Sequence, residues 1–229
     1  MPNSFPSARD RILRWTAIYE LQGQRWGSLP SLVAHMALTE ISKADGLRGR
    51  VIDIGCGYGR DLELFRSVFA HLELSGLDAS PSAIETARRK IPGLRIINAD
   101  IFQYGHEADT NRYHVAFANY FLHLFSDAEV LRIMRTMGAI VRREGRVVAS
   151  FVSVRDRHYG KGSKLCERCY EVTKGIPWRF RDREEILNLC RSSGLEAATI
   201  QEFEEVELVQ GRPDPVVGFY LVAKRPERK

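Results

Sequence analysis

The sequence predicts an α/β protein in which a mostly parallel sheet carries helices on both faces. Short runs of consecutive apolar residues alternate with amphipathic stretches from Arg50 to about Gly194, and such runs suit strands that are covered on both sides. The apolar fraction of 44% and the charged fraction of 28% are ordinary for a globular chain and exclude the disordered class. With 229 residues, the chain has the length of one substantial domain.

The segment that precedes the sheet is predicted to be helical. Apolar residues recur at helical spacing from Ile12 to Tyr19, and a second such pattern runs from Leu32 to Ile41. Gly27 to Pro30 breaks the pattern between them. We therefore expect two helices in an N-terminal extension that covers residues 1–48.

A core of strands and helices is expected over residues 50–154. Ser80 precedes a proline at the first helical position, and Ser126 is followed three residues later by Glu129, which is the spacing of a capping box. These signals predict helices between the strands. The five apolar runs that we expect to be strands are RVIDI, HLELSGL, LRIINA, YHVAFANY and RVVASFVSV.

The last part of the chain, residues 182–229, is expected to hold one helix and a closing strand pair. Asp182 and Glu185 form a second capping-box spacing at the start of that helix. The strand pair would comprise Leu195 to Phe203 and Val216 to Lys224. We expect a polar turn region between the two strands, containing Gly211, Pro213 and Pro215.

Residues 155–181 form the one long segment in which we expect irregular structure. It follows a predicted strand and is rich in aromatic residues. Irregular segments of this length inside a compact domain are usually functional or disordered. The aromatic content favours a substrate lid over disorder.

Glycines stand at alternate positions in VIDIGCGYGRD, residues 51–61, directly after the first predicted strand. In a doubly wound sheet, ligands bind beyond the carboxyl ends of the strands, at such a turn. The dinucleotide fingerprint requires a third glycine where this chain has Arg60. The spacing therefore counts against a dinucleotide.

This stretch resembles motif I of class I S-adenosylmethionine-dependent methyltransferases, and the resemblance extends over most of the chain. Three further segments match in order. LSGLDAS contains Asp78, INADIF contains Asp100, and ANYFLHLF contains Asn119 after the fourth predicted strand. The resemblance implies a doubly wound, Rossmann-like sheet of seven strands that ends in an antiparallel pair, within one methyltransferase domain over residues 1–229. The finer resemblance is to small-molecule methyltransferases.

The resemblance also implies a binding site for S-adenosylmethionine. Asp53 would reach the ammonium group of the cofactor, Asp78 would hold both ribose hydroxyls, and Asp100 would lie near the adenine amino group. A carboxylate suits a ribose diol because it can accept two hydrogen bonds at once. The implied cofactor-binding residues are Asp53, Gly55, Cys56, Gly57, Gly59, Asp78, Ala79, Asp100, Ile101 and Asn119.

The implied reaction moves the methyl group to a small-molecule acceptor by in-line displacement and leaves S-adenosylhomocysteine. Because the sulfonium leaving group is already activated, positioning supplies most of the effect. A general base is needed only for a protonated acceptor, and His123 is our candidate. Candidates for the acceptor pocket are Trp15, Tyr19, Trp26, His158, Tyr159 and Trp178.

Three other functions stay open. The basic segment from Arg132 to Arg191, with 15 Lys or Arg against seven Asp or Glu, is compatible with an anionic substrate or with RNA. An NAD(P)-dependent oxidoreductase could use Tyr170 and Lys174, although Gly175 and Pro177 would break the required helix. A module that binds S-adenosylmethionine without transferring the methyl group is the third alternative.

Composition and cysteine spacing set the remaining expectations. The stretch free of charged residues from His114 to Ser126 is too short to span a bilayer, and the N-terminus lacks an apolar signal region. We therefore expect a cytoplasmic protein, either monomeric or homodimeric, that has no membrane partner. Cys166 and Cys169 supply only two metal ligands, so no metal is expected and the cysteines are interpreted as reduced thiols.

Overall fold

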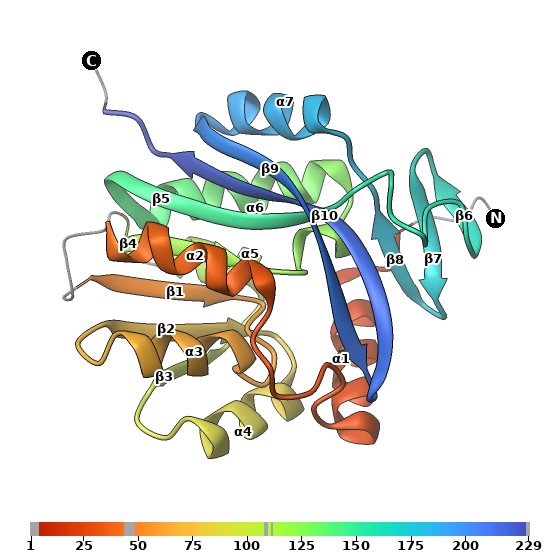
Figure 1. Ribbon diagram of the computed structural model, residues 1–229, viewed down its shortest axis with the longest axis horizontal. Coiled ribbons are helices and arrows are strands. Elements are labelled where there is room, and N and C mark those ends of the chain that lie inside the picture. The colour runs from red at the N-terminus through yellow and green to blue at the C-terminus, as the bar shows by residue number, and fades with distance from the viewer. Residues whose placement is uncertain (1–4, 44–48, 108–109, 111, 228–229) are drawn as a thin grey trace.

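The computed structural model describes residues 5–43, 49–107, 110 and 112–227. Its centre is a seven-stranded sheet with the strand order β3-β2-β1-β4-β5-β10-β9 (Figure 1). The first five strands are parallel, whereas β10 is antiparallel to both β5 and β9. This arrangement confirms the predicted α/β class with an antiparallel terminal pair. The strands are β1 (Arg50–Ile54), β2 (Glu73–Asp78), β3 (Arg95–Asn98), β4 (Tyr113–Ala118), β5 (Val141–Val152), β9 (Glu196–Val209) and β10 (Arg212–Lys224).

Helices pack on both faces of the sheet, and the apolar residues divide into two clusters accordingly. Alternate residues of β1 belong to different clusters, since Val51 packs on one face while Ile52 and Ile54 pack on the other. One face is covered by α2 (Leu32–Ser42), α3 (Arg60–Val68) and α4 (Pro81–Lys90), and the other by α5 (Ile101–Glu107), α6 (Asp127–Ile140) and α7 (Arg183–Ser193).

Capping residues fix where these helices begin. The side chains of Ser80, Ser126 and Asp182 accept hydrogen bonds from the first-turn backbone of α4, α6 and α7, and the last two make complete capping boxes. Ser31 caps α2 in the same way, and α1 (Ala8–Gln22) begins at Ser7. The expected helix positions are therefore confirmed at both ends of the chain. None of the helices in the described ranges has the length and apolar character needed to cross a bilayer.

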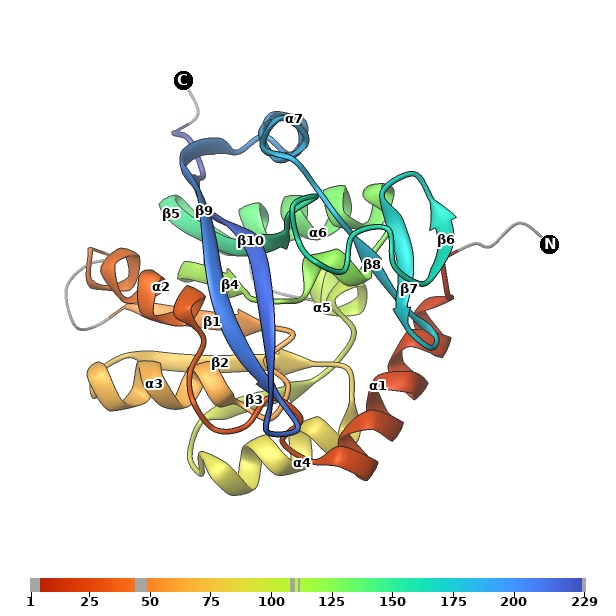
Figure 2. The same ribbon diagram turned by 45° about the vertical axis from the view of Figure 1, so that its right-hand side comes forward.

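The closing strand pair is longer than expected, and its turn is tighter. β9 and β10 pair from Glu196 with Lys224 to Val209 with Arg212, so Pro213 and Pro215 lie within a strand and not in a turn. These prolines are tolerated because β10 pairs with β5 only from Gly218 onward, which leaves one side of its first half without a partner strand. The hairpin therefore extends past the sheet and over its carboxyl edge (Figure 2).

The segment 155–181 was expected to be irregular, and this expectation is wrong. It contains a three-stranded antiparallel sheet made of β6 (Ser163–Cys166), β7 (Cys169–Thr173) and β8 (Ile176–Arg179). Its strands are only four or five residues long, so the alternation that marks a strand in a sequence is too brief to stand out. β8 contacts the short 3-10 helix η2 (Leu122–Leu124) and so joins this small sheet to the core.

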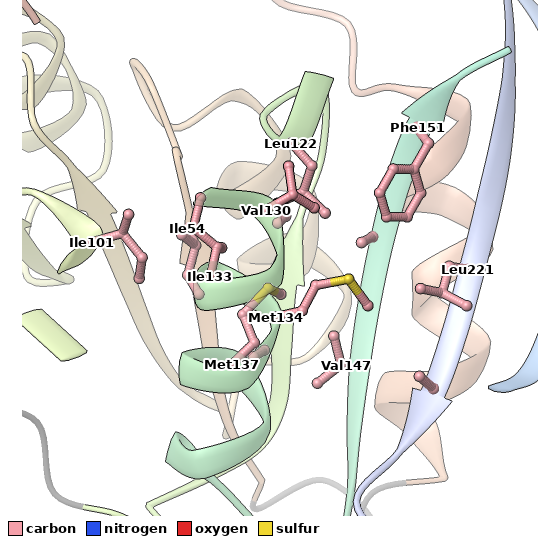
Figure 3. Close-up of a cluster of buried hydrophobic side chains, with 14 of the residues drawn as sticks. Ile54, Ile101, Leu122, Val130, Ile133, Met134, Met137, Val147, Phe151 and Leu221 are labelled. Carbon is pink, nitrogen blue, oxygen red and sulfur yellow. The ribbon is translucent and has the colours of Figure 1, made fainter. Parts of the chain in front are cut away.

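Packing of α6 against the sheet should contribute strongly to the stability of the fold. Met134 is fully buried among residues of β1, β5 and β10 (Figure 3). We predict that Met134→Ala lowers the free energy of unfolding by about 2–5 kcal/mol, because it removes apolar contacts and leaves a cavity. Leu21→Ala, at a side chain that is 85% exposed, is the control and should change it by less than about 0.5 kcal/mol. Urea unfolding measures both values, and equal effects would contradict the prediction.

Candidate functional site

A cavity lies at the carboxyl edge of the sheet, beside β1, where the strand order reverses between β2 and β4. This is the position at which doubly wound sheets bind ligands. It holds about 1110 Å³ of space, counted out to the solvent at its mouth. Four regions wall it: α1 with Trp26, the glycine loop, the ends of β2 and β3, and the segment after β4.

Two of the three loop glycines face this cavity. All three have positive φ, at 74° for Gly55, 53° for Gly57 and 80° for Gly59. A Cβ on Gly55 would lie 2.3 Å from the Phe121 ring, and one on Gly57 would lie 2.7 Å from the Tyr19 hydroxyl. The missing Cβ atoms let the Phe121 ring and the Tyr19 hydroxyl lie close to the loop backbone, whose amides at Gly55 and Cys56 both donate to the carbonyl of Leu77.

Gly59 serves a different purpose from the one implied by the resemblance. A Cβ there would lie 2.7 Å from Ile91, next to α4 and away from the cavity, and Gly59 is not among the cavity-lining residues. It is the N-cap of α3 in a left-handed conformation. The third glycine therefore permits the turn and the packing of α3 against α4.

Two of the predicted acids are held at the ends of consecutive strands. The Asp78 carboxylate at the end of β2 accepts hydrogen bonds from the amides of Gly57 (2.9 Å) and Ser80 (2.8 Å), one on each oxygen. Asp100 accepts one from the amide of Phe102 (2.7 Å). Each carboxylate oxygen keeps a further acceptor position. Both groups are thus fixed in orientation and able to accept hydrogen bonds from a ligand.

Asp53 is buried at the end of β1, lines the cavity, and accepts no hydrogen bond from any residue that the structure describes. Burial raises its pKa well above the ordinary value, and the nearby carboxylates of Asp61 and Asp78 raise it further, against the opposing effect of Arg60. An unpaired buried carboxylate among other acids is a costly arrangement that a bound cation would relieve.

Sequence reasoning missed a polar network between α2 and β5. The Asn119 amide donates to Ser31 (2.8 Å) and Asp61 (3.0 Å), and its oxygen accepts from Ser150 (2.7 Å). The Ser150 oxygen also accepts a hydrogen bond from the backbone amide of Tyr120. The φ of Tyr120 is 46°, which is unusual for a residue other than glycine. Asp61 is the last residue of VIDIGCGYGRD, and its position just after the glycines was the one signal in the sequence for this network.

Helix α1 forms the roof of the cavity. Trp15 and Tyr19 line it together with Trp26, and these three rings pack against one another with centroids 5.6–6.4 Å apart. Thr16 donates a hydrogen bond to Ser80 at the start of α4. The structure thus places half of the predicted acceptor residues at the cofactor edge and makes the N-terminal extension part of the site.

The other half of the predicted acceptor residues lies elsewhere. His158, Tyr159 and Trp178 are not among the cavity-lining residues. Trp178 packs between the rings of His123 and His158, with centroid distances of 5.0 and 5.1 Å. These residues attach the small sheet to η2 and do not enclose the cavity.

His123 is also outside the cavity lining, although its neighbours Leu124 and Phe121 belong to it. Its side chain is buried, and Nδ1 has no hydrogen-bond partner within the described ranges. Burial lowers the pKa of His123 to about 3, which makes the imidazole a weak proton acceptor. The geometry therefore gives no support for a general base at this position.

The cysteines occupy structural positions. Cys56 is in the cavity wall, but a Cβ on Gly76 would lie 2.8 Å from its sulfur, so the thiol also packs against β2. Cys166 and Cys169 face each other across the β6–β7 turn as free thiols. Over the part of the chain that the structure describes, no three His, Cys, Asp or Glu side chains are placed to hold a metal ion.

Comparison with known proteins agrees with this geometry. Residues 51–145, which run from β1 into β5, match the family model of a methyltransferase domain. Residues 51–145 of this chain are thus similar to a methyltransferase domain. This match agrees with the class I resemblance, which implied S-adenosylmethionine as the cofactor.

Relatives of the methyltransferase domain are similar over limited segments. A trans-aconitate 2-methyltransferase of Rhizobium rhizogenes is 31% identical over 91 residues, which are 39% of this chain and 33% of that protein. A dTDP-4-amino-2,3,4,6-tetradeoxy-D-glucose N,N-dimethyltransferase of Saccharopolyspora spinosa is 31% identical over 87 residues, or 38% and 32%. The chain spans about a third or less of the length of the curated relatives it matches.

The similarity of the fold extends further. The structure of Burkholderia thailandensis 1,6-didemethyltoxoflavin-N1-methyltransferase, bound to 1,6-didemethyltoxoflavin and S-adenosylhomocysteine, superposes with a TM-score of 0.72. The superposition covers 99% of this chain and 94% of that one at 18% sequence identity. The regions of this chain that flank residues 51–145 therefore share the fold of the corresponding regions in the Burkholderia structure.

The destabilising effect of the Asp53 charge on the fold can be measured in the ligand-free protein. Because its folded pKa is raised, the stability it contributes is fully present below its unfolded pKa of about 3.9 and is lost as the pH rises through the folded value. Asp53→Asn removes the charge at constant shape. We predict that this variant is more stable than the wild type at pH 7.5 and that the advantage shrinks toward pH 4.

Chemical denaturation across this pH range measures the difference in unfolding free energy. Glu196→Gln, at an exposed acid on β9, is the matched control and should show little change at any pH. A difference between Asp53→Asn and the wild type that does not vary with pH would contradict the prediction.

Proposed function

We propose that this protein transfers the methyl group of S-adenosylmethionine to a small-molecule acceptor. The observation that carries the proposal is the cavity at the carboxyl edge, where the glycine loop meets the unpaired Asp53 carboxylate and the fixed carboxylates of Asp78 and Asp100. This set of acceptors fits the donors of an amino acid joined to a nucleoside. Its excess of carboxylates fits a ligand that carries an ammonium and a sulfonium group.

Each wall would bind one part of the cofactor. Asp53 and the backbone of the glycine loop would lie against the methionine end, Asp78 would accept hydrogen bonds from the ribose hydroxyls, and Asp100 would accept one from the adenine amino group. Ala79 and Ile101 also line the cavity and would contact the nucleoside. Asn119 would act mainly by fixing Asp61 and the segment after β4.

The chain's own contribution to the reaction is positioning and exclusion of water. S-adenosylmethionine, when bound, supplies a methyl group on an activated sulfonium. The aromatic roof of Trp15, Tyr19 and Trp26 would keep bulk water from the reacting atoms and would limit how an acceptor can approach. Among the residues that the structure describes, no histidine or lysine lines the cavity, so the proposed mechanism uses no base of either type.

A small molecule is the acceptor class that the roof favours, because α1 and the rings of Trp15, Tyr19 and Trp26 cover the cavity. We propose that residues 1–229 act as one unit, since α1 completes the cavity of the core. The basic residues of the segment 132–191 do not line the cavity, and this argues against RNA as the substrate.

Removal of the Asp78 carboxylate should weaken cofactor binding specifically. We predict that Asp78→Ala lowers the affinity for S-adenosylhomocysteine by about 1.5–3 kcal/mol, the range for hydrogen bonds to a charged group. Glu73→Ala, at the exposed opposite end of the same strand, should leave the affinity unchanged. Calorimetric titration measures both, with NAD as a second ligand that should not bind.

Binding alone does not distinguish an enzyme from a module that only binds the cofactor. Transfer of a labelled methyl group to any compound in an acceptor screen would establish the enzyme. Saturable binding of NAD in place of S-adenosylhomocysteine would overturn the proposed function altogether. Loss of binding in Glu73→Ala as well would show that Asp78 has no specific role.

A further inference from the structure

The charges around the cavity restrict the acceptor, if the proposed function holds. We propose that the acceptor is an amine on a flat aromatic body and that the site rejects anionic acceptors. This differs from the anionic substrate that the basic segment 132–191 suggested. The inference rests on how the two arginines of the cavity wall are paired.

Arg60 is one of these two arginines, and its charge is already matched. It donates hydrogen bonds to both carboxylate oxygens of Glu207, at 2.6 and 3.0 Å, and its Nε lies 3.5 Å from Asp61. Both partners of the bidentate pair are nearly buried, with side-chain exposures of 11% and 7%. Burial alone would lower the pKa of Arg60, but Asp61 and Glu207 raise it overall.

Arg11 is the second arginine, and it is matched in the same manner. Its guanidinium donates to Glu129 (2.5 Å) and to the carbonyl of Pro6 (2.7 Å). It also lies over the ring of Phe125, 4.7 Å from the centroid. An anionic acceptor would have to displace Glu129 or Glu207 from a buried pair to reach either arginine, and breaking such a pair is costly.

The acids of the wall, by contrast, outnumber the arginines. Asp53, Asp61, Asp78 and Asp100 all line the cavity, while Glu129 and Glu207 already neutralise Arg11 and Arg60. With the cofactor's ammonium group set against Asp53, the formal charge of the wall stays negative, because Asp78 and Asp100 would accept hydrogen bonds from uncharged groups. It favours cations and neutral molecules over anions.

The shape of the remaining wall favours a flat aromatic body. Aromatic rings from several elements line the cavity, among them Trp15, Tyr19, Trp26, Phe121 and Phe125. Aromatic rings bind other rings by stacking and attract cations over their faces. An aromatic amine combines both properties in one molecule.

An amine also needs no histidine or lysine base, which agrees with the composition of the wall. The lone pair of the neutral amine forms the new N–C bond as the C–S bond breaks, and the electron pair of that bond goes to sulfur. The methylated nitrogen is then an ammonium group, which releases one proton to water after the product has left the cavity. An acceptor in the ammonium form would lose a proton to water before it enters the cavity.

This inference can be tested with three ligands that share a naphthalene ring and differ in charge: one cation, one neutral molecule and one anion. We would titrate 1-naphthylmethylamine, 1-naphthalenemethanol and 1-naphthoate into the protein saturated with S-adenosylhomocysteine at pH 7.5, using calorimetry. The amine should bind at least about tenfold more tightly than the carboxylate, with the alcohol between them. If naphthoate binds as tightly as the amine or more tightly, the charge argument is wrong. If none of the three ligands binds, the proposal of an aromatic acceptor is wrong.

Release of Arg60 from its partner supplies a second arm. Glu207→Gln should increase the affinity for naphthoate at least about fivefold and lower the affinity for the amine. The control is Glu204→Gln, at an exposed position on the same strand, which should change neither affinity. An unchanged naphthoate affinity in Glu207→Gln would count against the pairing argument. If this variant loses S-adenosylhomocysteine binding, the wild-type series decides alone.

The first titration of the series separates the two proposals. Failure of the wild type to bind S-adenosylhomocysteine would remove the proposed function together with this inference. Binding of S-adenosylhomocysteine with a preference for naphthoate would remove only the inference.

Discussion

The buried, unpaired carboxylate of Asp53 is the constraint around which the cofactor edge is built. A charge in this position destabilises the folded chain, and the neighbouring acids Asp61 and Asp78 increase the cost. Such an arrangement persists where a ligand compensates for it. The rest of the edge supports it, because the glycine loop removes side chains and the network around Asn119 holds the nearest acid in place.

Much of the fold could be predicted from local patterns. The strands that are buried on both faces gave continuous apolar runs, and the helices of the core began at Ser80, Ser126 and Asp182 as the capping signals indicated. These features depend on neighbouring residues alone. The acids at the ends of β1, β2 and β3 were predicted from the family resemblance, and the parallel strands do bring them to one edge of the sheet.

The remaining parts depend on contacts between distant segments. Nothing near Glu207 in the sequence indicates that it meets Arg60, since the pair forms only when the closing hairpin extends past the sheet. The prolines of β10 suggested a turn because the missing partner on one side of that strand is a tertiary property. His123 was chosen for its place after β4, but the direction of its side chain depends on packing against Trp178.

The β9–β10 hairpin joins the two ends of the chain. The amide of Gln210 at its tip donates to the carbonyl of Arg25 just after α1 (2.7 Å), and Glu205 accepts from the amide of Leu32 at the start of α2 (2.8 Å). Segments made first during synthesis are therefore fixed by segments made last. A nascent chain that has already formed β1 to β5 therefore still lacks these two ties, and α1 is then held only by its contacts with the core, such as the one between Thr16 and Ser80.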